Sequence, residues 1–160
     1  MADFLLDLLS NLLKINNFNL QKYCNDLISK EPDKILISSN LSSIPEKLLA
    51  SIIQNDNLQM SDIQVWENVF KRGIAQNPEL PSDITNYSKE DFNTLKNTLQ
   101  QCIPFVRFYN LTSKEFSDKV YPYRKILPKE LRSELVKEFL NLLDPDSKIK
   151  QRSKPHIRYK

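Results

Sequence analysis

Residues 61–78, with the sequence SDIQVWENVFKRGIAQNP, decide the fold class of this 160-residue chain. Ser61 followed three residues later by Gln64 is a capping-box pattern, which marks the start of a helix. Pro78 restricts the residue before it, so the helix is expected to end at Asn77. Between these two signals apolar residues recur at helical spacing and predict one buried face, made of Ile63, Trp66, Val69, Phe70 and Ile74.

The same kinds of signal on either side predict further amphipathic helices. Ser43 and Ser88 are expected helix caps, and Thr112 with Glu115 is a second capping box. The expected helices span residues 3–14, 19–30, 44–53, 61–77, 88–103, 112–121 and 129–143. Their predicted inward faces include Tyr23 and Cys24 in 19–30, and Leu131, Leu135, Val136, Phe139 and Leu140 in 129–143.

The chain has one glycine, Gly73. Strand-rich folds use glycines in hairpin turns and bulges, and phosphate-binding loops need several of them, so both are disfavoured. The expected fold is therefore all-α, a single domain of about seven short amphipathic helices stacked as helical hairpins.

The residues that carry chemistry are too few to predict an active site. Cys24 and Cys102 lie far apart in apolar stretches and are expected to be reduced core thiols. His156 is the only histidine and lies in a polar C-terminal segment, so a nucleophile would have no histidine base in a folded region. We therefore expect no catalytic, cofactor-binding or metal-binding residues and no enzymatic activity.

The apolar run from Phe4 to Ile15 is not expected to be a targeting segment. Asp3 and Asp7 precede any cation, no small-residue cleavage site follows, and Lys14 interrupts the run. A signal peptide has the opposite charge order, and a membrane span needs about 20 apolar residues. We expect an intracellular, soluble protein without a membrane partner, located in the cytoplasm, with the nucleus as the alternative.

The C-terminal segment is strongly basic. Residues 148–160 contain no acid and six basic residues, Lys148, Lys150, Arg152, Lys154, Arg158 and Lys160. Without these six, 17 of the 23 basic residues remain against 20 acidic ones, so the rest of the chain carries a formal charge of −3. We interpret 147–160 as a basic flexible tail or linker, the alternative being a segment that binds nucleic acid or another acidic surface.

Two stretches resemble the BACK domain, the helical module of BTB–BACK adaptor proteins. Residues 56–70, DNLQMSDIQVWENVF, resemble the Asp-x-Leu turn and capped helix at its centre, and residues 106–116, VRFYNLTSKEF, resemble its Val-Arg-Phe segment. The resemblance divides the chain into an apolar helix at 1–16, similar to a last BTB helix, a BACK-like domain at 17–146 and the tail at 147–160. The family-signature core would comprise Leu58, Val65, Trp66, Val69, Phe70, Val106, Arg107, Phe108 and Phe116.

The resemblance implies a protein–protein interaction module. In such adaptors the BTB domain grips a cullin scaffold of a ubiquitin ligase, and the BACK domain is a helical spacer that positions a Kelch or TLDc domain. A cullin would be a partner of this chain only if a BTB domain were supplied. The apolar face of the first helix is then either core or a partner surface, and a weak homodimer through it is expected; its residues are Phe4, Leu5, Leu8, Leu9 and Leu12.

Single residues within the two stretches carry further expectations. Arg72 stands where the family usually has a tryptophan, which implies the loss of an apolar anchor, and Gly73 is expected to loosen the helix end. Trp66 invites a binding hot-spot interpretation, but its place on the inward face with Phe70 favours core packing. Arg107 is expected at a buried helix junction, where its guanidinium would bond carbonyls at the end of the preceding helix.

Overall fold

A computed structural model describes residues 11, 14, 18–37 and 41–143 of the chain. Every regular element in these residues is helical, so the all-α prediction is confirmed there. The predicted tail at 147–160 and, apart from Asn11 and Lys14, the predicted helix at 3–14 lie outside the described residues. The described α-helices are α2 (Phe18–Lys30), α3 (Pro32–Leu36), α4 (Glu46–Ile53), α5 (Asp62–Ala75), α6 (Lys89–Leu99), α7 (Ser113–Glu115) and α8 (Lys129–Leu143).

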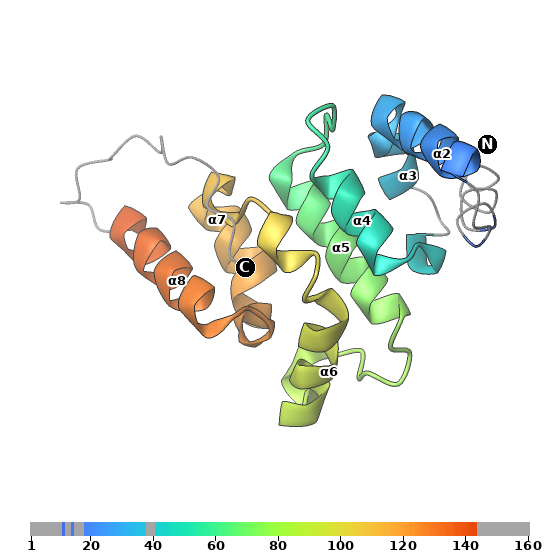
Figure 1. Cartoon of the computed structure of the whole chain (residues 1–160). Helices are drawn as coiled ribbons and strands as arrows, with labels where there is room; N and C mark the ends of the chain where they lie inside the picture. The colour runs from blue at the N-terminus through green and yellow to red at the C-terminus, as the bar shows by residue number, and fades with distance from the viewer. Residues whose placement is uncertain (1–10, 12–13, 15–17, 38–40, 144–160) are drawn as a thin grey trace.

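Shorter helical turns join these helices. In Figure 1 the chain passes from α2 and α3 at one end of the molecule, through α4 and α5, to α7 and α8 at the other end. Helix α6 packs against α5, and α8 packs against α7 and the turn before α8, so α8 lies at an edge of the molecule. The turns are η1 (Leu41–Ser43), η2 (Ile84–Asn86), η3 (Ile103–Phe105), η4 (Phe108–Asn110) and η6 (Tyr121–Ile126), which are 3₁₀-helices, and η5 (Phe116–Val120), which is a π-helix.

The predicted capping boxes fix where the central helices begin. The Ser61 N–H donates to Gln64 Oε1 at 3.1 Å, and the Gln64 N–H donates to Ser61 Oγ at 3.4 Å, which starts α5. Thr112 and Glu115 start α7 in the same reciprocal way. Ser88 caps α6 as predicted, and the carboxylate three residues later completes a third box. Each box satisfies two backbone donors that the first helical turn leaves without partners.

Trp66 lies in the core. Its side chain is 1% exposed, and its ring centroid lies 5.2 Å from that of Phe108 and 5.6 Å from that of Phe70. The indole Nε1–H donates to the carbonyl oxygen of Lys119 at 3.0 Å, across 53 residues of sequence. The core-packing interpretation is therefore confirmed, and Trp66 also links α5 to η5.

Arg72 anchors α5 in a way that the sequence did not predict. Its side chain is 6% exposed, and its Nε–H and Nη2–H donate to the carbonyl oxygen of Ile44 at 3.0 and 2.6 Å. Burial lowers the pKa of the guanidinium, while Cys102 and the charge of Glu46 act in the opposite direction. Instead of losing an anchor, the end of α5 gains a polar clamp on the turn that precedes α4.

Gly73 lies where α5 meets α6. A Cβ atom at this position would lie 2.8 Å from Leu99 Cδ2 and 2.9 Å from Leu95 Cδ1, closer than the roughly 3.5–4.0 Å at which carbon atoms pack. The missing side chain thus permits the close approach of the two helices. Helix α5 continues past Gly73 to Ala75, two residues before its expected end at Asn77, and Asn77 Nδ2 donates to the Gly73 carbonyl at 2.8 Å.

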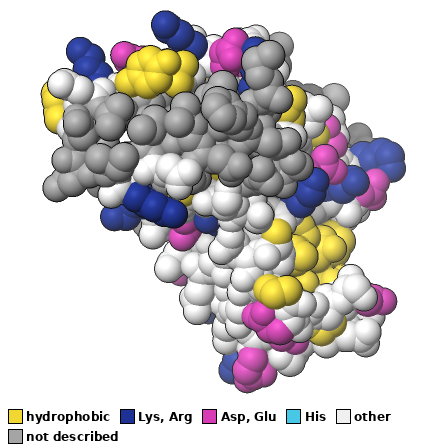
Figure 2. All heavy atoms as spheres, turned by 90° about the vertical axis from the view of Figure 1, so that its right-hand side faces the viewer, with side chains coloured by type: hydrophobic (Ala, Val, Ile, Leu, Met, Phe, Trp, Pro, Cys, Tyr) yellow, Lys and Arg dark blue, Asp and Glu magenta, His cyan; other side chains and the backbone are white. Residues whose placement is uncertain are grey.

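Two predicted inward residues are exposed. Tyr23 is 55% exposed, because it lies five positions before the buried Ile28 and so about 140° around α2 from it. Leu140 is 60% exposed, because the core row of α8 runs through Leu135 and Phe139, and Leu140 lies about 100° beyond Phe139. Figure 2 shows the α2 end of the molecule, where surface hydrophobic side chains lie beside charged ones.

Several helix limits also differ from the predicted ones. Helix α4 begins at Glu46 with Pro45 at its N-cap position, and Ser43 belongs to η1. Helix α6 ends at Leu99, so that the residues up to 103 form a turn and η3. The predicted helix at 112–121 is one α-helical turn followed by the π-helix η5.

Cys102 is a buried, unpaired thiol, as expected, whereas the side chain of Cys24 lies outside the described part. Burial, with the charge of Glu46 as the second cause, raises the pKa of the Cys102 thiol to about 12. Since the unfolded thiol has a pKa of about 8.5, the stability linked to this group is complete below that pH. It is lost as the pH rises towards about 12.

The Cys102 thiol is expected to react very slowly in the folded chain. In a Cys24→Ser variant, modification by a disulfide reagent near pH 8 should be about a thousandfold slower than for free cysteine, because the thiolate fraction falls with the raised pKa. Unfolding the chain in denaturant should restore the free-cysteine rate. A folded-state rate equal to that of free cysteine would contradict the burial of Cys102.

Candidate functional site

The residues predicted as functional separate into two groups in the structure. The candidate partner-binding residues Phe4, Leu5, Leu8, Leu9 and Leu12 lie outside the described residues. Within the family-signature set, Leu58, Phe70 and Arg107 are half-buried, and the other six are buried, namely Val65, Trp66, Val69, Val106, Phe108 and Phe116. Among the described residues no hydrogen bond joins the Arg107 guanidinium to carbonyls at the end of the preceding helix, so the contact expected there is absent. The apolar members of the signature set thus lie in the core or pack against it.

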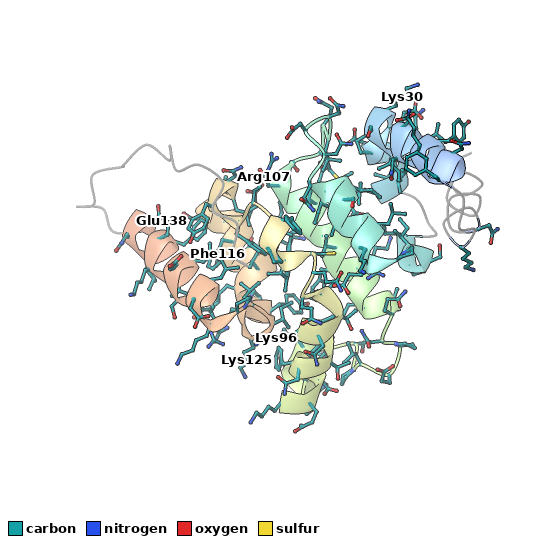
Figure 3. The ribbon with its side chains drawn as sticks, in the orientation of Figure 1. Lys30, Lys96, Arg107, Phe116, Lys125 and Glu138 are labelled. Atoms are coloured by element: carbon teal, nitrogen blue, oxygen red, sulfur yellow. The ribbon has the colours of Figure 1, made fainter. Side chains whose placement is uncertain are left out.

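An apolar groove opens between α8 and the segment that contains α7 and η5. We call it the α8 groove; it encloses about 210 Å³. Phe116 lies on the side of η5 that faces α8 (Figure 3), and its ring stacks on that of Phe139 with centroids 4.2 Å apart and an 8° angle between the planes. The lining residues are Ser113, Phe116, Ser117, Tyr121, Val136, Phe139 and Leu140.

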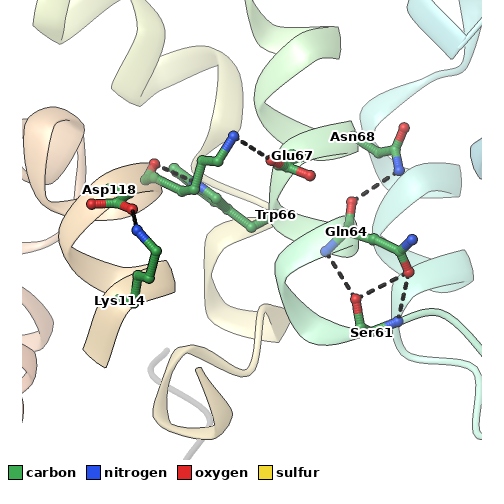
Figure 4. Close-up of polar contacts among 8 residues, drawn as sticks. Ser61, Gln64, Trp66, Glu67, Asn68, Lys114 and Asp118 are labelled. Carbon is green, nitrogen blue, oxygen red and sulfur yellow. Dashed lines mark hydrogen bonds and ion pairs between the residues drawn. The ribbon is translucent and has the colours of Figure 1, made fainter. Parts of the chain in front are cut away.

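The π-helix η5 shapes one wall of this groove. The Tyr121 N–H donates to the carbonyl oxygen of Phe116, five residues earlier, which is the wide spacing of a π-helix. The indole of Trp66 holds the Lys119 carbonyl of the same segment, and the Lys119 ammonium lies 3.0 Å from the Glu67 carboxylate (Figure 4). Helix α5 therefore fixes η5 by two contacts. Short π-helical segments occur frequently at functional sites.

Charged groups flank the wall formed by η5 and η6. The Arg124 guanidinium carbon lies 4.1 Å from the centroid of the Tyr121 ring, and its Nη1–H donates to the Tyr121 carbonyl at 2.9 Å. Lys114 and Asp118 form an ion pair of 2.7 Å, and the hydrogen bond to Asp118, together with its charge, raises the pKa of Lys114. The pair cancels in net charge, whereas Arg124 is stacked on Tyr121, a residue that lines the groove.

The groove differs from the other exposed apolar side chains described. Phe18, Tyr23 and Ile37 are exposed at the α2 end of the molecule. The residues of the α8 groove come from four elements, α7, η5, η6 and α8, and together enclose a volume, with buried aromatic rings beneath and Leu140 at the exposed edge. Pockets for small molecules usually enclose about 300–1,000 Å³, so this smaller, open groove suits one or two side chains of a docked polypeptide.

Other kinds of site are not formed by the described residues. No group of three or more His, Cys, Asp or Glu side chains among them could hold a metal ion. None of the described helices combines the length and apolar character that a bilayer span requires.

The α8 groove could have been found only in part from sequence. Val136, Phe139 and Leu140 were predicted to face inward, and the row at spacing four that contains Val136 and Leu140 was the available signal for a second apolar surface. The opposite wall had no such signal, because it depends on a π-helix.

Comparisons of the chain with protein-family models, with curated proteins and with solved structures gave no match.

Proposed function

We propose that this protein is a protein–protein interaction module, a BACK-like helical spacer of the kind found in cullin-type ubiquitin-ligase adaptors, and that the α8 groove is a surface where a protein partner docks. The observation that carries the proposal is the open apolar groove, with Leu140 exposed at its edge and aromatic rings at its floor. The proposed cellular location is the cytoplasm or the nucleus. A cullin would be a partner only together with a BTB domain.

Physical chemistry favours docking at this groove. Full burial of a leucine side chain is worth about 1.5–3 kcal/mol relative to full exposure, so the exposed Leu140 leaves much of that gain to be made on binding. The stacked rings of Phe116 and Phe139 give the groove a rigid floor, and a rigid floor reduces the ordering cost of association. Apolar grooves of this kind bind the apolar face of a partner helix in many complexes.

Leu140→Gln is expected to abolish partner binding and leave the fold intact. Substitutions of exposed side chains usually change the free energy of unfolding by no more than about 0.5 kcal/mol. The measurement is affinity purification from cells that express the tagged chain, followed by quantitative mass spectrometry. Partners recovered with the intact chain should fall at least about tenfold with Leu140→Gln, because the substitution removes the exposed apolar side chain that docking would bury.

The matched control is Ile37→Gln, which removes an apolar side chain of similar exposure, 67%, at the other end of the molecule. Its recovered partners should equal those of the intact chain. Equal recovery with all three proteins would contradict the groove as a docking surface.

The basic tail provides a second candidate function, binding to nucleic acid or another acidic surface, favoured by six basic residues without an acid in 148–160. Such binding must weaken steeply with salt, because it releases counterions from phosphates. A tail variant with Lys148, Lys150, Arg152 and Lys154 changed to Gln separates the two functions. If this variant loses its partners while Leu140→Gln keeps them, the tail function replaces the groove function.

A further inference from the structure

Helix α8 separates its charges on either side of its core row. Residues four apart share a row along a helix, and the core row is Leu131, Leu135 and Phe139. On one side of the core row lies an acidic row. On the other side lies the groove row, which lines the α8 groove, and beyond it lies a row with two lysines, the lysine row. These are Glu130, Glu134 and Glu138 on the acidic side, then Arg132, Val136 and Leu140 in the groove row, and Lys129, Ser133 and Lys137 in the lysine row.

The acidic row faces away from the groove. The Glu134 carboxylate accepts a hydrogen bond from the Tyr109 hydroxyl at 2.9 Å, which places this row beside η4. Figure 3 shows Glu138 on the same helix. The acidic row and the groove row lie about 160° apart across the solvent side of the helix. On its solvent side, α8 therefore places the lysine row between the groove row and the acidic row.

Cations border the groove on both sides. Lys129 and Lys137 are exposed and lie about 60° from the groove row, on its solvent side. Arg132 lies in the groove row itself, one turn before Val136, and is half-buried. On the opposite wall, Arg124 is stacked on Tyr121, a lining residue. Among the described residues its guanidinium makes one hydrogen bond, to the Tyr121 carbonyl, which leaves most of its five donors for an anion.

From this arrangement we propose that the α8 groove binds an acidic amphipathic helical segment of a protein partner. Its apolar side chains enter the groove between Phe116, Val136 and Leu140, and its carboxylates meet Arg124, Lys129 and Lys137. This inference rests on the proposed function and adds the chemical class of the partner. A nucleic acid fits the arrangement less well, because its phosphates would gain nothing from the apolar floor between the cations.

The test selects ligands from random sequences, so the natural partner need not be identified first. A displayed library of random peptides of about 16 residues, long enough for the i, i+4, i+7 anchors of a helix, is panned on the full chain, with Leu140→Gln for counter-selection. Enriched peptides should be acidic and carry apolar residues at helical spacing. The synthesised peptides are then titrated by fluorescence anisotropy against the intact chain and its variants.

The charge variant is the double substitution Lys129→Glu, Lys137→Glu, whose side chains are both exposed. It should weaken peptide binding about tenfold at roughly 50 mM salt and clearly less at roughly 300 mM salt, because exposed charges are screened. The matched control is Lys47→Glu with Lys89→Glu, two exposed lysines on α4 and α6, which should change the affinity by less than about twofold.

The outcomes separate the inference from the function on which it rests. If no peptide is enriched over the counter-selection, both the groove function and its acidic partner are wrong. If enriched peptides need Leu140 but are neutral or basic, or bind the lysine variant as tightly as the intact chain, the groove function stands and the acidic partner is wrong.

Discussion

Trp66→Ala is expected to lower the free energy of unfolding by about 3–5 kcal/mol, the usual loss when a buried aromatic side chain is truncated. The indole is 1% exposed, packs against the rings of Phe70 and Phe108, and donates its N–H to the Lys119 carbonyl. Its removal leaves a cavity between α5 and η4 and frees the carbonyl of η5. Urea unfolding followed by far-UV circular dichroism measures the change without relying on the lost tryptophan.

Two further variants separate the contributions to the loss in the free energy of unfolding. Trp66→Phe keeps an aromatic ring but removes the N–H donor, and should lose less than the alanine variant, with about 1–3 kcal/mol arising from the unpaired carbonyl. Tyr23→Ala truncates an aromatic side chain that is 55% exposed and should cost about 0.5 kcal/mol or less. An unchanged unfolding midpoint for Trp66→Ala would show that the indole is not part of the core.

Arg72→Ala is expected to lower the free energy of unfolding by about 3 kcal/mol, from a cavity left in the core and an unpaired backbone acceptor. The guanidinium makes two hydrogen bonds to the Ile44 carbonyl, and that carbonyl precedes Pro45, at the start of α4. Loss of the clamp should loosen the contact between α5 and the turn before α4. The same urea titration measures the effect.

Arg72→Met separates the two causes, because it retains much of the side-chain volume and removes every donor. We expect it to be destabilised by about 1–3 kcal/mol, the penalty for the unpaired Ile44 carbonyl. A buried charge also carries a desolvation cost, which methionine would relieve. If Arg72→Met is as stable as the intact chain, the clamp specifies the position of α4 without a net contribution to stability.

The sequence was sufficient for the helical class and for most helix starts. Ser61, Ser88 and Thr112 lie where predicted, because a capping box is a local interaction that four residues determine by themselves. The core position of Trp66 also followed from helical spacing alone. These are the features for which local preference and tertiary packing agree.

The features that the sequence did not predict depend on contacts between distant residues. An arginine in an amphipathic helix usually indicates a solvent-facing position, whereas the buried Arg72 donates to the Ile44 carbonyl, 28 residues away. Gly73 was expected to weaken α5, whereas in the structure Leu95 and Leu99 of α6 pack where a side chain at position 73 would lie. Neither partner is visible in the local pattern.

The candidate site was likewise predictable only where it depends on local helical periodicity. The α8 wall of the groove is helical, so its residues could be predicted from periodicity even though Leu140 was assigned to the core. The η5 wall could not be predicted, because the wide hydrogen-bond spacing of a π-helix has no recognised sequence signal. The same segment also accepts the hydrogen bond from Trp66 at the Lys119 carbonyl, a contact between distant residues.

The π-helix η5 also affects how this chain should be aligned with any protein of the same architecture. A π-helical turn contains about one residue more than an α-helical turn, so the side chains after Val120 are rotated by about 100° relative to an uninterrupted α-helix. A counterpart with an ordinary α-helix here would be one residue shorter between Phe116 and Val120. Its core residues would fall into register only after a single-residue gap in this segment. The change that distinguishes the two forms would be an insertion or a deletion, which a comparison restricted to substitutions would miss.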